Sequence, residues 1–187
     1  MPGGYESHFP ILAACIARTT GPILELGVGE GSTPMIHYSA PNRFRVSADT
    51  DLSWLRKFAE GYYSPRQHEF IHVDATPIKG IPDVTVGIQA WRKFSMIETC
   101  QWGCVIVDCA PGEARHELAI RLANRAHFVI LHDSETDYQA GGNYMYSEAT
   151  VRYKHVSEFR RFRPYTMVCS NVELFSIEEC DKTWTPV

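Results

Sequence analysis

The feature that most constrains the fold is an apolar segment that runs directly into three alternating glycines. The segment Ile23–Thr33 reads I-L-E-L-G-V-G-E-G-S-T, with glycines at Gly27, Gly29 and Gly31. Glycine tolerates positive φ and lets a backbone approach a ligand closely. We expect a helix to follow, capped by Ser32 or Thr33. The segment therefore predicts a strand, a ligand-binding loop and a helix at the carboxyl edge of an α/β sheet.

The rest of the chain alternates between short apolar runs and helical patterns. Such near-continuous apolar runs are typical of parallel strands covered on both faces. The expected strands are Ile23–Val28, Phe44–Ala48, Glu69–Val73, Cys104–Val107 and Phe128–Leu131, followed by a hairpin of Tyr165–Cys169 and Val172–Ile177. The pattern predicts one domain over residues 1–187, a doubly wound, Rossmann-like sheet of seven strands, mostly parallel with an antiparallel C-terminal hairpin.

Charge and composition exclude several classes of protein. The formal net charge is −4, which disfavours a nucleic-acid binder because such proteins usually carry a basic surface. No apolar run approaches the roughly 20 residues that span a bilayer, and no signal-peptide pattern is present, so we expect no membrane association. The six cysteines show no disulfide framework spacing, which favours free thiols and a cytoplasmic protein. The oligomeric state stays open.

Two cofactor interpretations compete for the glycine loop. A dinucleotide-binding loop has the spacing G-x-G-x-x-G, but here the third glycine comes one residue early and Ser32 takes its place. The segment instead resembles motif I of class I S-adenosylmethionine-dependent methyltransferases, E-x-G-x-G-x-G, at Glu25, Gly27, Gly29 and Gly31. The resemblance implies S-adenosylmethionine as the cofactor, held also by Ser32 and Thr33, with a NAD-binding Rossmann protein as the less favoured alternative.

Acidic residues follow the predicted strands at the same edge. Asp49 lies 22 residues after Gly27, near the spacing at which an acid binds a ribose in nucleotide-binding α/β folds; Asp51 is its rival, or else a helix cap. The resemblance implies that Asp74 and Ala75 contact the adenine and that Asp108 belongs to the motif IV region. Together the acids predict a negatively charged rim that suits a sulfonium cofactor.

The fifth predicted strand ends in His132 and Asp133. Strands four and five are neighbours in this fold, about 4.8 Å apart, so Asp108 and Asp133 are expected to converge and could bind Mg²⁺ or another divalent cation. This is similar to metal-dependent O-methyltransferases of the catechol type, although Ser134 replaces their asparagine. His132 resembles the histidine of sugar O-methyltransferases of the macrocin type and of xylan-methylating enzymes. Three roles stay open: His132 as general base, Asp133 as metal ligand, or a structural pair.

The region after strand four favours oxygen over nitrogen as the methyl acceptor. Nitrogen-methylating members of the superfamily often carry Asn/Asp-Pro-Pro-Tyr there, whereas this chain has Asp-Cys-Ala-Pro over residues 108–111. We therefore expect an S-adenosylmethionine-dependent O-methyltransferase for a small-molecule or sugar hydroxyl, with His132, Asp133 and Asp108 as catalytic residues. The alternative is a cofactor-binding scaffold of the same fold that lacks chemistry.

Four further features are candidates for acceptor recognition. The loops expected at Thr76–Gly87 and Ser134–Tyr146 flank the site, and Tyr144 or Tyr146 could line an acceptor pocket. His8, at the start of the first expected helix, is a second candidate for the site. Basic residues cluster near the C-terminus and predict a solvated helix face or, alternatively, a surface for a phosphate- or carboxylate-bearing acceptor. They are Arg152, Lys154, His155, Arg160, Arg161 and Arg163.

Overall fold

A computed structural model describes residues 7–135, 144–178 and 180. The chain forms one seven-stranded sheet in the order β3-β2-β1-β4-β5-β7-β6. The strands are β1 (Ile23–Leu26), β2 (Arg45–Asp49), β3 (His68–His72), β4 (Trp102–Val107), β5 (Ala126–His132), β6 (His155–Phe159) and β7 (Thr166–Ser170). The first five are parallel, and β7 runs antiparallel to both β5 and β6. The predicted α/β sheet with an antiparallel C-terminal pair is confirmed.

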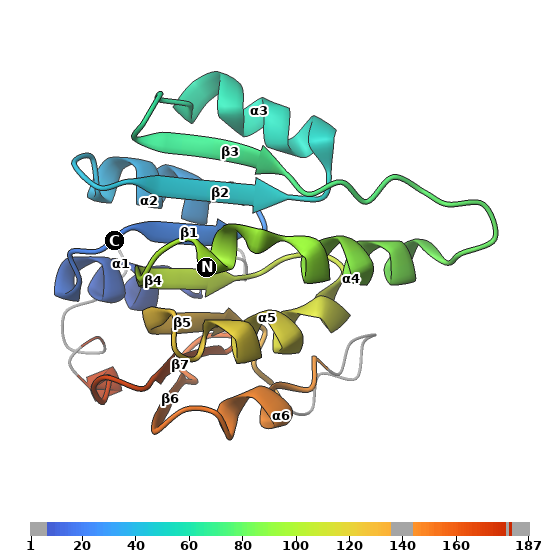
Figure 1. The fold of residues 1–187 in the computed structure, drawn as a ribbon. Coiled ribbons are helices and arrows are strands. Elements are labelled where there is room, and N and C mark those ends of the chain that lie inside the picture. The colour runs from blue at the N-terminus through green and yellow to red at the C-terminus, as the bar shows by residue number, and fades with distance from the viewer. Residues whose placement is uncertain (1–6, 136–143, 179, 181–187) are drawn as a thin grey trace.

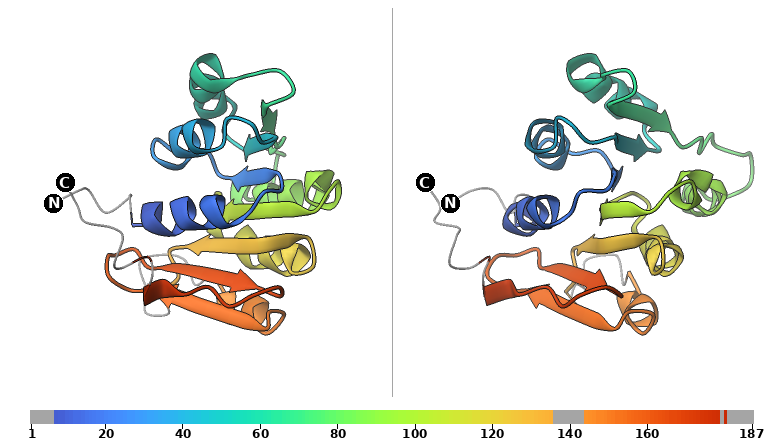
Figure 2. Two further views of the ribbon diagram at one scale, coloured as in Figure 1. Left: turned by 90° about the vertical axis from the view of Figure 1, so that its left-hand side faces the viewer. Right: turned by 60° about the vertical axis from the view of Figure 1, so that its left-hand side comes forward.

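Helices cover both faces of this sheet (Figures 1 and 2). They are α1 (Phe9–Arg18), α2 (Ser32–Ser39), α3 (Leu52–Tyr62), α4 (Asp83–Lys93), α5 (Arg115–Leu122) and α6 (Tyr146–Thr150), with short 3₁₀ turns at Ser95–Glu98 and Gly112–Ala114. Figure 2 shows α1, α2 and α3 on one face and α4, α5 and α6 on the other. Among the described residues, no helix is both long and apolar enough to cross a membrane.

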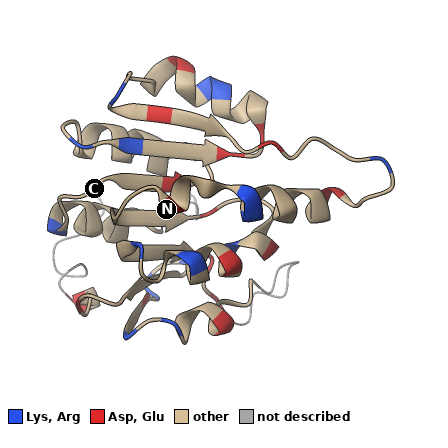
Figure 3. Ribbon diagram, viewed as in Figure 1, with Lys and Arg blue, Asp and Glu red and all other residues tan. Residues whose placement is uncertain are grey.

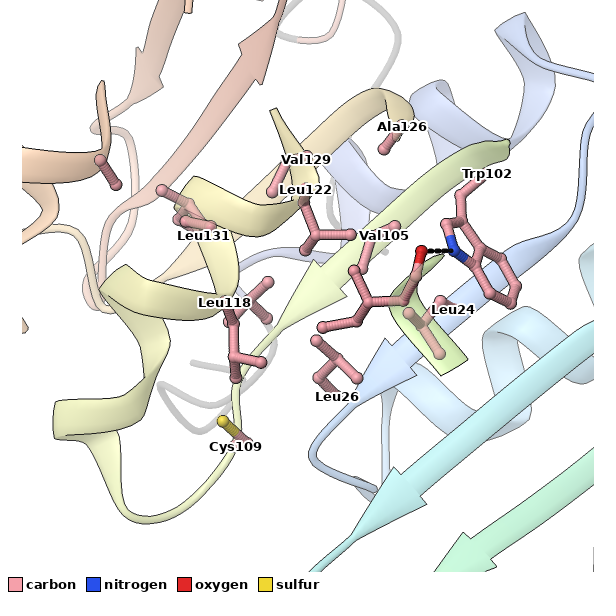
Figure 4. Close-up of a cluster of buried hydrophobic side chains, with 14 of the residues drawn as sticks. Leu24, Leu26, Trp102, Val105, Cys109, Leu118, Leu122, Ala126, Val129 and Leu131 are labelled. Carbon is pink, nitrogen blue, oxygen red and sulfur yellow. Dashed lines mark hydrogen bonds between the residues drawn. The ribbon is translucent and has the colours of Figure 1, made fainter. Parts of the chain in front are cut away.

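The sheet is apolar on both faces because its strands are buried between the helical layers. Successive residues of a strand point to opposite faces, so Val105 joins the core beneath α5, whereas Cys104 joins the core beneath α1. Figure 4 shows the first of these cores, where Leu118 and Leu122 of α5 pack over the central strands. The central strands β4 and β5 therefore read as nearly continuous apolar runs rather than as alternating ones.

The predicted C-terminal hairpin is wrong in its pairing. Its first strand, Tyr165–Cys169, matches β7, but the partner of β7 is the earlier segment His155–Phe159, not Val172–Ile177. Both edges of β7 are occupied, by β5 and by β6, so no edge is left for the later segment. Phe175 is buried nevertheless, and its ring centroid lies 5.4 Å from that of Phe128. The apolar pattern of 172–177 reflects this packing and not a strand.

Two other local predictions need correction. The expected loop Thr76–Gly87 is shorter, because α4 begins at Asp83; what remains extends beyond the carboxyl edge of the sheet, as the long green loop of Figure 1 shows. The basic cluster does not form a helix face. It flanks and includes the edge strand β6, which follows α6. The Gly-rich part of the expected loop Ser134–Tyr146, residues 136–143, lies outside the described residues.

Candidate active site

The glycine loop connects β1 to α2 and requires glycine at two positions for different reasons. Gly27 has φ +98°, and a Cβ there would overlap the backbone carbonyl of Asp108 on the neighbouring strand. Its amide also donates a hydrogen bond of 2.9 Å to the carbonyl of Ala48. At Gly31 a Cβ would overlap the ring of Phe9, which packs directly on the loop. The alternating glycines therefore let β1 approach β4 and let the start of α1 approach the loop.

Glu25, on β1, stabilises this loop through buried hydrogen bonds. It is fully buried, and its carboxylate accepts hydrogen bonds from Thr33 Oγ1 at 3.0 and 2.9 Å and from Ser47 Oγ at 2.5 Å. The Thr33 hydroxyl in turn accepts a hydrogen bond from the amide of Gly29 at 3.1 Å. Burial raises the pKa of Glu25 to about 7, although hydrogen bonds from serine and threonine hydroxyls oppose the rise. Glu25 and Thr33 thus hold the loop together.

The predicted cap of α2 is wrong. Gly31 precedes the first residue of this helix, Ser32, and no side chain caps the helix. Thr33 is engaged with Glu25 because α2 starts directly over the end of β1, within reach of this buried acid. Ser32 and Thr33 are both buried, and only Ser32 lines the cavity described below.

The predicted acids do stand at the carboxyl edge of the sheet, where Figure 3 shows red positions at the arrowhead ends. Asp49 accepts hydrogen bonds of 2.8 Å from the amides of Val28 and Asp51, so it joins the glycine loop to the end of β2. Asp51 caps α3 through the amides of Ser53 and Trp54. Asp74 is exposed and accepts hydrogen bonds from Thr76. The adenine and ribose contacts assigned to these residues and to the half-buried Ala75 stay predictions.

His132, Asp108 and Asp133 meet where β4 and β5 end. His132 Nδ1 lies 3.2 Å from Asp108 Oδ2 and 3.4 Å from Asp133 Oδ1, and the His132 side chain is almost fully buried. Its other nitrogen, Nε2, lies 3.2 Å from Ser7 Oγ, a hydrogen bond whose direction depends on the tautomer. Burial lowers the pKa of His132, but Asp108 and Asp133 outweigh burial and the net change is upward.

Arg115 is the site residue that the sequence analysis missed. Its side chain is 8% exposed, and its guanidinium Nη2 lies 2.9 Å from Asp108 Oδ1 while Nη1 lies 2.8 Å from Asp133 Oδ2. Nε donates to the carbonyl of Cys109 at 2.8 Å. Arg115 is the first residue of α5, which begins just beyond the end of β4, so the loop 108–114 brings its side chain back over both carboxylates.

The donor set does not fit a divalent cation. Asp108, His132 and Asp133 each offer one ligand atom, all within 4.8 Å of one another. However, one oxygen of each carboxylate contacts Arg115 and the other faces His132 Nδ1. A metal ion would have to displace a buried guanidinium from between them. The sequence predicted that Asp108 and Asp133 converge, but not that the guanidinium of Arg115 lies between them.

A cavity of about 760 Å³ opens beside these residues. The glycine loop, α2 and the start of α1 contribute to its wall, together with Asp108 and His132. Its lining residues are His8, Phe9, Gly29, Glu30, Gly31, Ser32, Pro34, Met35, Tyr38, Trp54, Asp108 and His132. One continuous space thus reaches both the predicted cofactor loop and the histidine–aspartate pair.

His8 lines this cavity with an unsatisfied imidazole. It is 4% exposed, and neither ring nitrogen has a hydrogen-bond partner among the described residues. Its ring centroid lies 4.7 Å from that of His132 in an edge-to-face arrangement. Burial, helped by the nearby His132, lowers the pKa of His8 to about 3, so its imidazole is neutral near pH 7. A neutral imidazole can both donate and accept a hydrogen bond.

The two tyrosines expected in an acceptor pocket, Tyr144 and Tyr146, instead contact Arg115 and the backbone of His132. Tyr146 is buried and donates a hydrogen bond of 2.9 Å to the carbonyl of His132. The ring of Tyr144 lies 4.5 Å from the guanidinium carbon of Arg115. Neither residue lines the cavity. They brace the ends of β5 and α5, because a buried Tyr hydroxyl needs a polar partner and a tyrosine face attracts a cation.

No family model matches the chain, and no curated protein matches it by sequence. Solved structures do match its fold. Human methyltransferase-like protein 13 in complex with SAH superposes with a TM-score of 0.64 at 13% identity over 95% of this chain and 88% of that one. The fibrillarin pre-rRNA processing protein of Methanococcus jannaschii gives 0.53 at 11% identity, over 83% and 68% of the two chains. Spermidine synthase from Thermotoga maritima gives 0.51 at 12% identity, over 98% and 72%.

These similarities define the class of fold. The chain has the class I methyltransferase fold, which the sequence predicted from motif I and the order of its strands. Identities this low establish the fold alone.

Proposed function

We propose that this protein is an S-adenosylmethionine-dependent methyltransferase that methylates a hydroxyl oxygen of a small molecule or sugar. The observation that carries the proposal is the shared cavity. Its wall includes Gly29 and Gly31 of the motif I loop on one side and His132 with Asp108 on the other. A methyl donor over the loop and an acceptor at His132 would therefore occupy one space.

The loop supports binding of an adenosyl cofactor in this place. Gly29 and Gly31 present backbone rather than side chains to the cavity, and Asp49 stands at the end of β2, where an acid commonly binds a ribose. S-adenosylmethionine would supply an electrophilic methyl group on a positively charged sulfur. The nearby carboxylates of Asp49 and Asp108 favour that positive charge.

His132 supports proton removal from an acceptor hydroxyl. Nε2 lies 3.2 Å from the hydroxyl of Ser7, so an acceptor hydroxyl would take the place of this serine hydroxyl. In the proposed step Nε2 would take the hydroxyl proton, and bound S-adenosylmethionine would supply the methyl group to the oxygen lone pair and leave as neutral S-adenosylhomocysteine. The proton stays on His132, where Asp108 stabilises the imidazolium.

The environment of the cavity is consistent with an alcohol or phenol acceptor. Such a hydroxyl holds its proton near pH 7 and needs a base, whereas a neutral amine already presents a lone pair. His8 offers a second, neutral imidazole 4.7 Å from the His132 ring, suited to orient the hydroxyl by a hydrogen bond. Orientation of the oxygen toward the methyl carbon is itself a large contribution to rate.

The test begins with binding. Calorimetry with S-adenosylhomocysteine and with NAD decides the cofactor: we expect the first to bind and the second not to. Transfer of a radiolabelled methyl group to a panel of simple phenols and free sugars then decides the chemistry. Replacement of His132 by alanine should abolish transfer and retain binding of S-adenosylhomocysteine. His127→Ala, at the opposite end of β5, is the matched control and should remain active.

The outcomes separate the alternatives. Binding of NAD alone would refute the methyltransferase assignment. Binding of S-adenosylhomocysteine with no transfer to any member of the panel would favour a cofactor-binding scaffold. Full activity in the His132→Ala protein would move acceptor activation to another residue.

A further inference from the structure

Arg115 stands where the converging acids led us to expect a divalent cation. Its two terminal nitrogens contact different carboxylates, Nη2 with Asp108 and Nη1 with Asp133, at 2.9 and 2.8 Å. We propose that Arg115 replaces the metal ion of this site, so that the enzyme works without a divalent cation and Arg115 acts as the positioning residue for His132 and Asp108. This inference rests on the proposed methyl transfer but concerns how the site is held.

The guanidinium ties together the ends of two strands. Besides the carboxylates, it donates to the carbonyl of Cys109, at 2.8 Å, and reaches the carbonyl of His132, at 3.4 Å. These contacts join the residues that follow β4 to the last residue of β5. A metal ion bound by Asp108 and Asp133 would also join the ends of β4 and β5. Because Arg115 already joins them, the site needs no metal ion for this purpose.

Charge also argues against a second cation. Asp108 and Asp133 carry two negative charges, and Arg115 neutralises one of them permanently because a guanidinium does not deprotonate in proteins. A divalent ion between the same carboxylates would meet Arg115 at close range in a half-buried site, where like charges repel strongly. The remaining oxygens of the two carboxylates face His132 Nδ1 and are therefore not directed at a metal position between the acids.

Arg115 is not free to move away. Its side chain is 8% exposed, the ring of Tyr144 covers the guanidinium at 4.5 Å, and a Cβ on Gly112 would overlap that same ring. Removal of the guanidinium would leave two acids without their buried partner, which is costly. The arginine is therefore a fixed part of the site.

The arginine acts on catalysis through Asp108. With Oδ1 held by Arg115, the other oxygen, Oδ2, is directed at His132 Nδ1 at 3.2 Å. The two carboxylates beside Nδ1 favour a proton on that nitrogen, which would leave the lone pair of Nε2 toward Ser7. Loss of Arg115 should release Asp108 and Asp133 from this geometry and make their oxygens available to a metal ion.

The experiment is a Mn²⁺ titration of the full chain, followed by electron paramagnetic resonance, with S-adenosylhomocysteine present. We expect the wild-type protein to show no stoichiometric Mn²⁺ binding. Arg115→Met, which keeps the length of the side chain but removes its charge, should gain one bound Mn²⁺, and Asp133→Asn in that background should abolish the gain. Arg92→Met is the matched control: it breaks a surface pair with Glu117 and should gain none.

Several results would overturn the inference. One is stoichiometric Mn²⁺ binding by the wild-type protein that Asp133→Asn removes; another is an Arg115→Met protein that binds S-adenosylhomocysteine but no Mn²⁺. If Arg115→Met fails to fold, Arg115→Lys takes its place. The lysine keeps a positive charge but cannot bridge both carboxylates. The Arg115→Lys protein should therefore bind Mn²⁺, more weakly than we expect for Arg115→Met, and the absence of any Mn²⁺ binding would also refute the proposal. Calorimetry with S-adenosylhomocysteine alone reports on the proposed function, so the two failures are distinguishable.

Discussion

The buried acid beneath the glycine loop predicts an unusual dependence of stability on pH. Glu25 is fully buried, and burial raises its pKa from 4.5 to about 7. The folded protein therefore holds the Glu25 proton more tightly than the unfolded chain does. This contribution to stability is complete below pH 4.5 and is lost as the pH rises through about 7. Glu25→Gln, which keeps the shape but cannot ionise, should remove the dependence.

The size of the effect follows from the two pKa values. At about 1.4 kcal/mol per pKa unit, the difference between 4.5 and about 7 corresponds to roughly 3 kcal/mol in the free energy of unfolding. Relative to Glu25→Gln, the wild-type protein should therefore lose about 3 kcal/mol of stability between pH 4.5 and pH 8. All other titrating groups are common to the two proteins, so their contributions cancel in the comparison.

Urea denaturation at a series of pH values measures this directly. The free energy of unfolding, extrapolated to water, is compared for the wild-type protein and Glu25→Gln at each pH. Glu60→Gln, an exposed glutamate on α3, controls for the loss of an acid as such and should parallel the wild type. If the wild-type and Glu25→Gln curves also run parallel, the pKa of Glu25 is the same in the folded and unfolded proteins, and the reasoning is refuted.

Further predictions concern single residues at four positions. Gly27→Ala should lower the free energy of unfolding by more than about 1 kcal/mol and abolish calorimetric binding of S-adenosylhomocysteine, because φ is +98° and a Cβ would meet backbone. Gly61 lies on α3 with open space around it, so Gly61→Ala should instead raise the free energy of unfolding by about 0.5–1 kcal/mol, measured by urea denaturation. If both Gly27→Ala and Gly61→Ala lower the free energy of unfolding, the loss at Gly27 is not specific to its backbone conformation. Asp51→Ala should cost about 1 kcal/mol in the same measurement, and Asp51→Asn less, since Asp51 caps α3; equal losses would contradict a capping role. His8→Phe should keep binding of S-adenosylhomocysteine but lower kcat/KM for the acceptor, and unchanged kinetics would exclude His8 from acceptor binding.

The central strands were predictable because burial on both faces leaves a simple signal. β1 and β4 are mostly apolar runs between turn residues, with Glu25 as the one charged residue, and the structure changes their ends by at most two residues. The edge of the sheet was not predictable in this way. β6, with the sequence His-Val-Ser-Glu-Phe, is only partly buried and mixes polar with apolar residues. The later segment 172–177 looked more like a strand, yet it is not paired in the sheet and only packs Phe175 and Ile177 against the core.

The candidate site shows the same division. Asp108, His132 and Asp133 were predictable, because residues that follow neighbouring parallel strands meet at one edge. Arg115 was not, since nothing in the local sequence says where the loop after β4 turns back. A signal did exist: two buried acids expected within one strand spacing require a cation, and Arg115 is the first basic residue after Asp108. A divalent cation was one of the roles predicted for these acids, and an arginine was not considered.

The hydrogen bond between Ser7 and His132 joins residues 125 positions apart in the chain. Contacts of such long range cannot form until the intervening sheet has assembled, because the entropy of closing that loop must be recovered by many other contacts. We therefore expect the histidine pair and its cavity to be completed late in folding. Partly folded or locally frayed forms that keep most of the sheet would lose the acceptor side of the site first, so activity would disappear before bulk helical structure as conditions become denaturing.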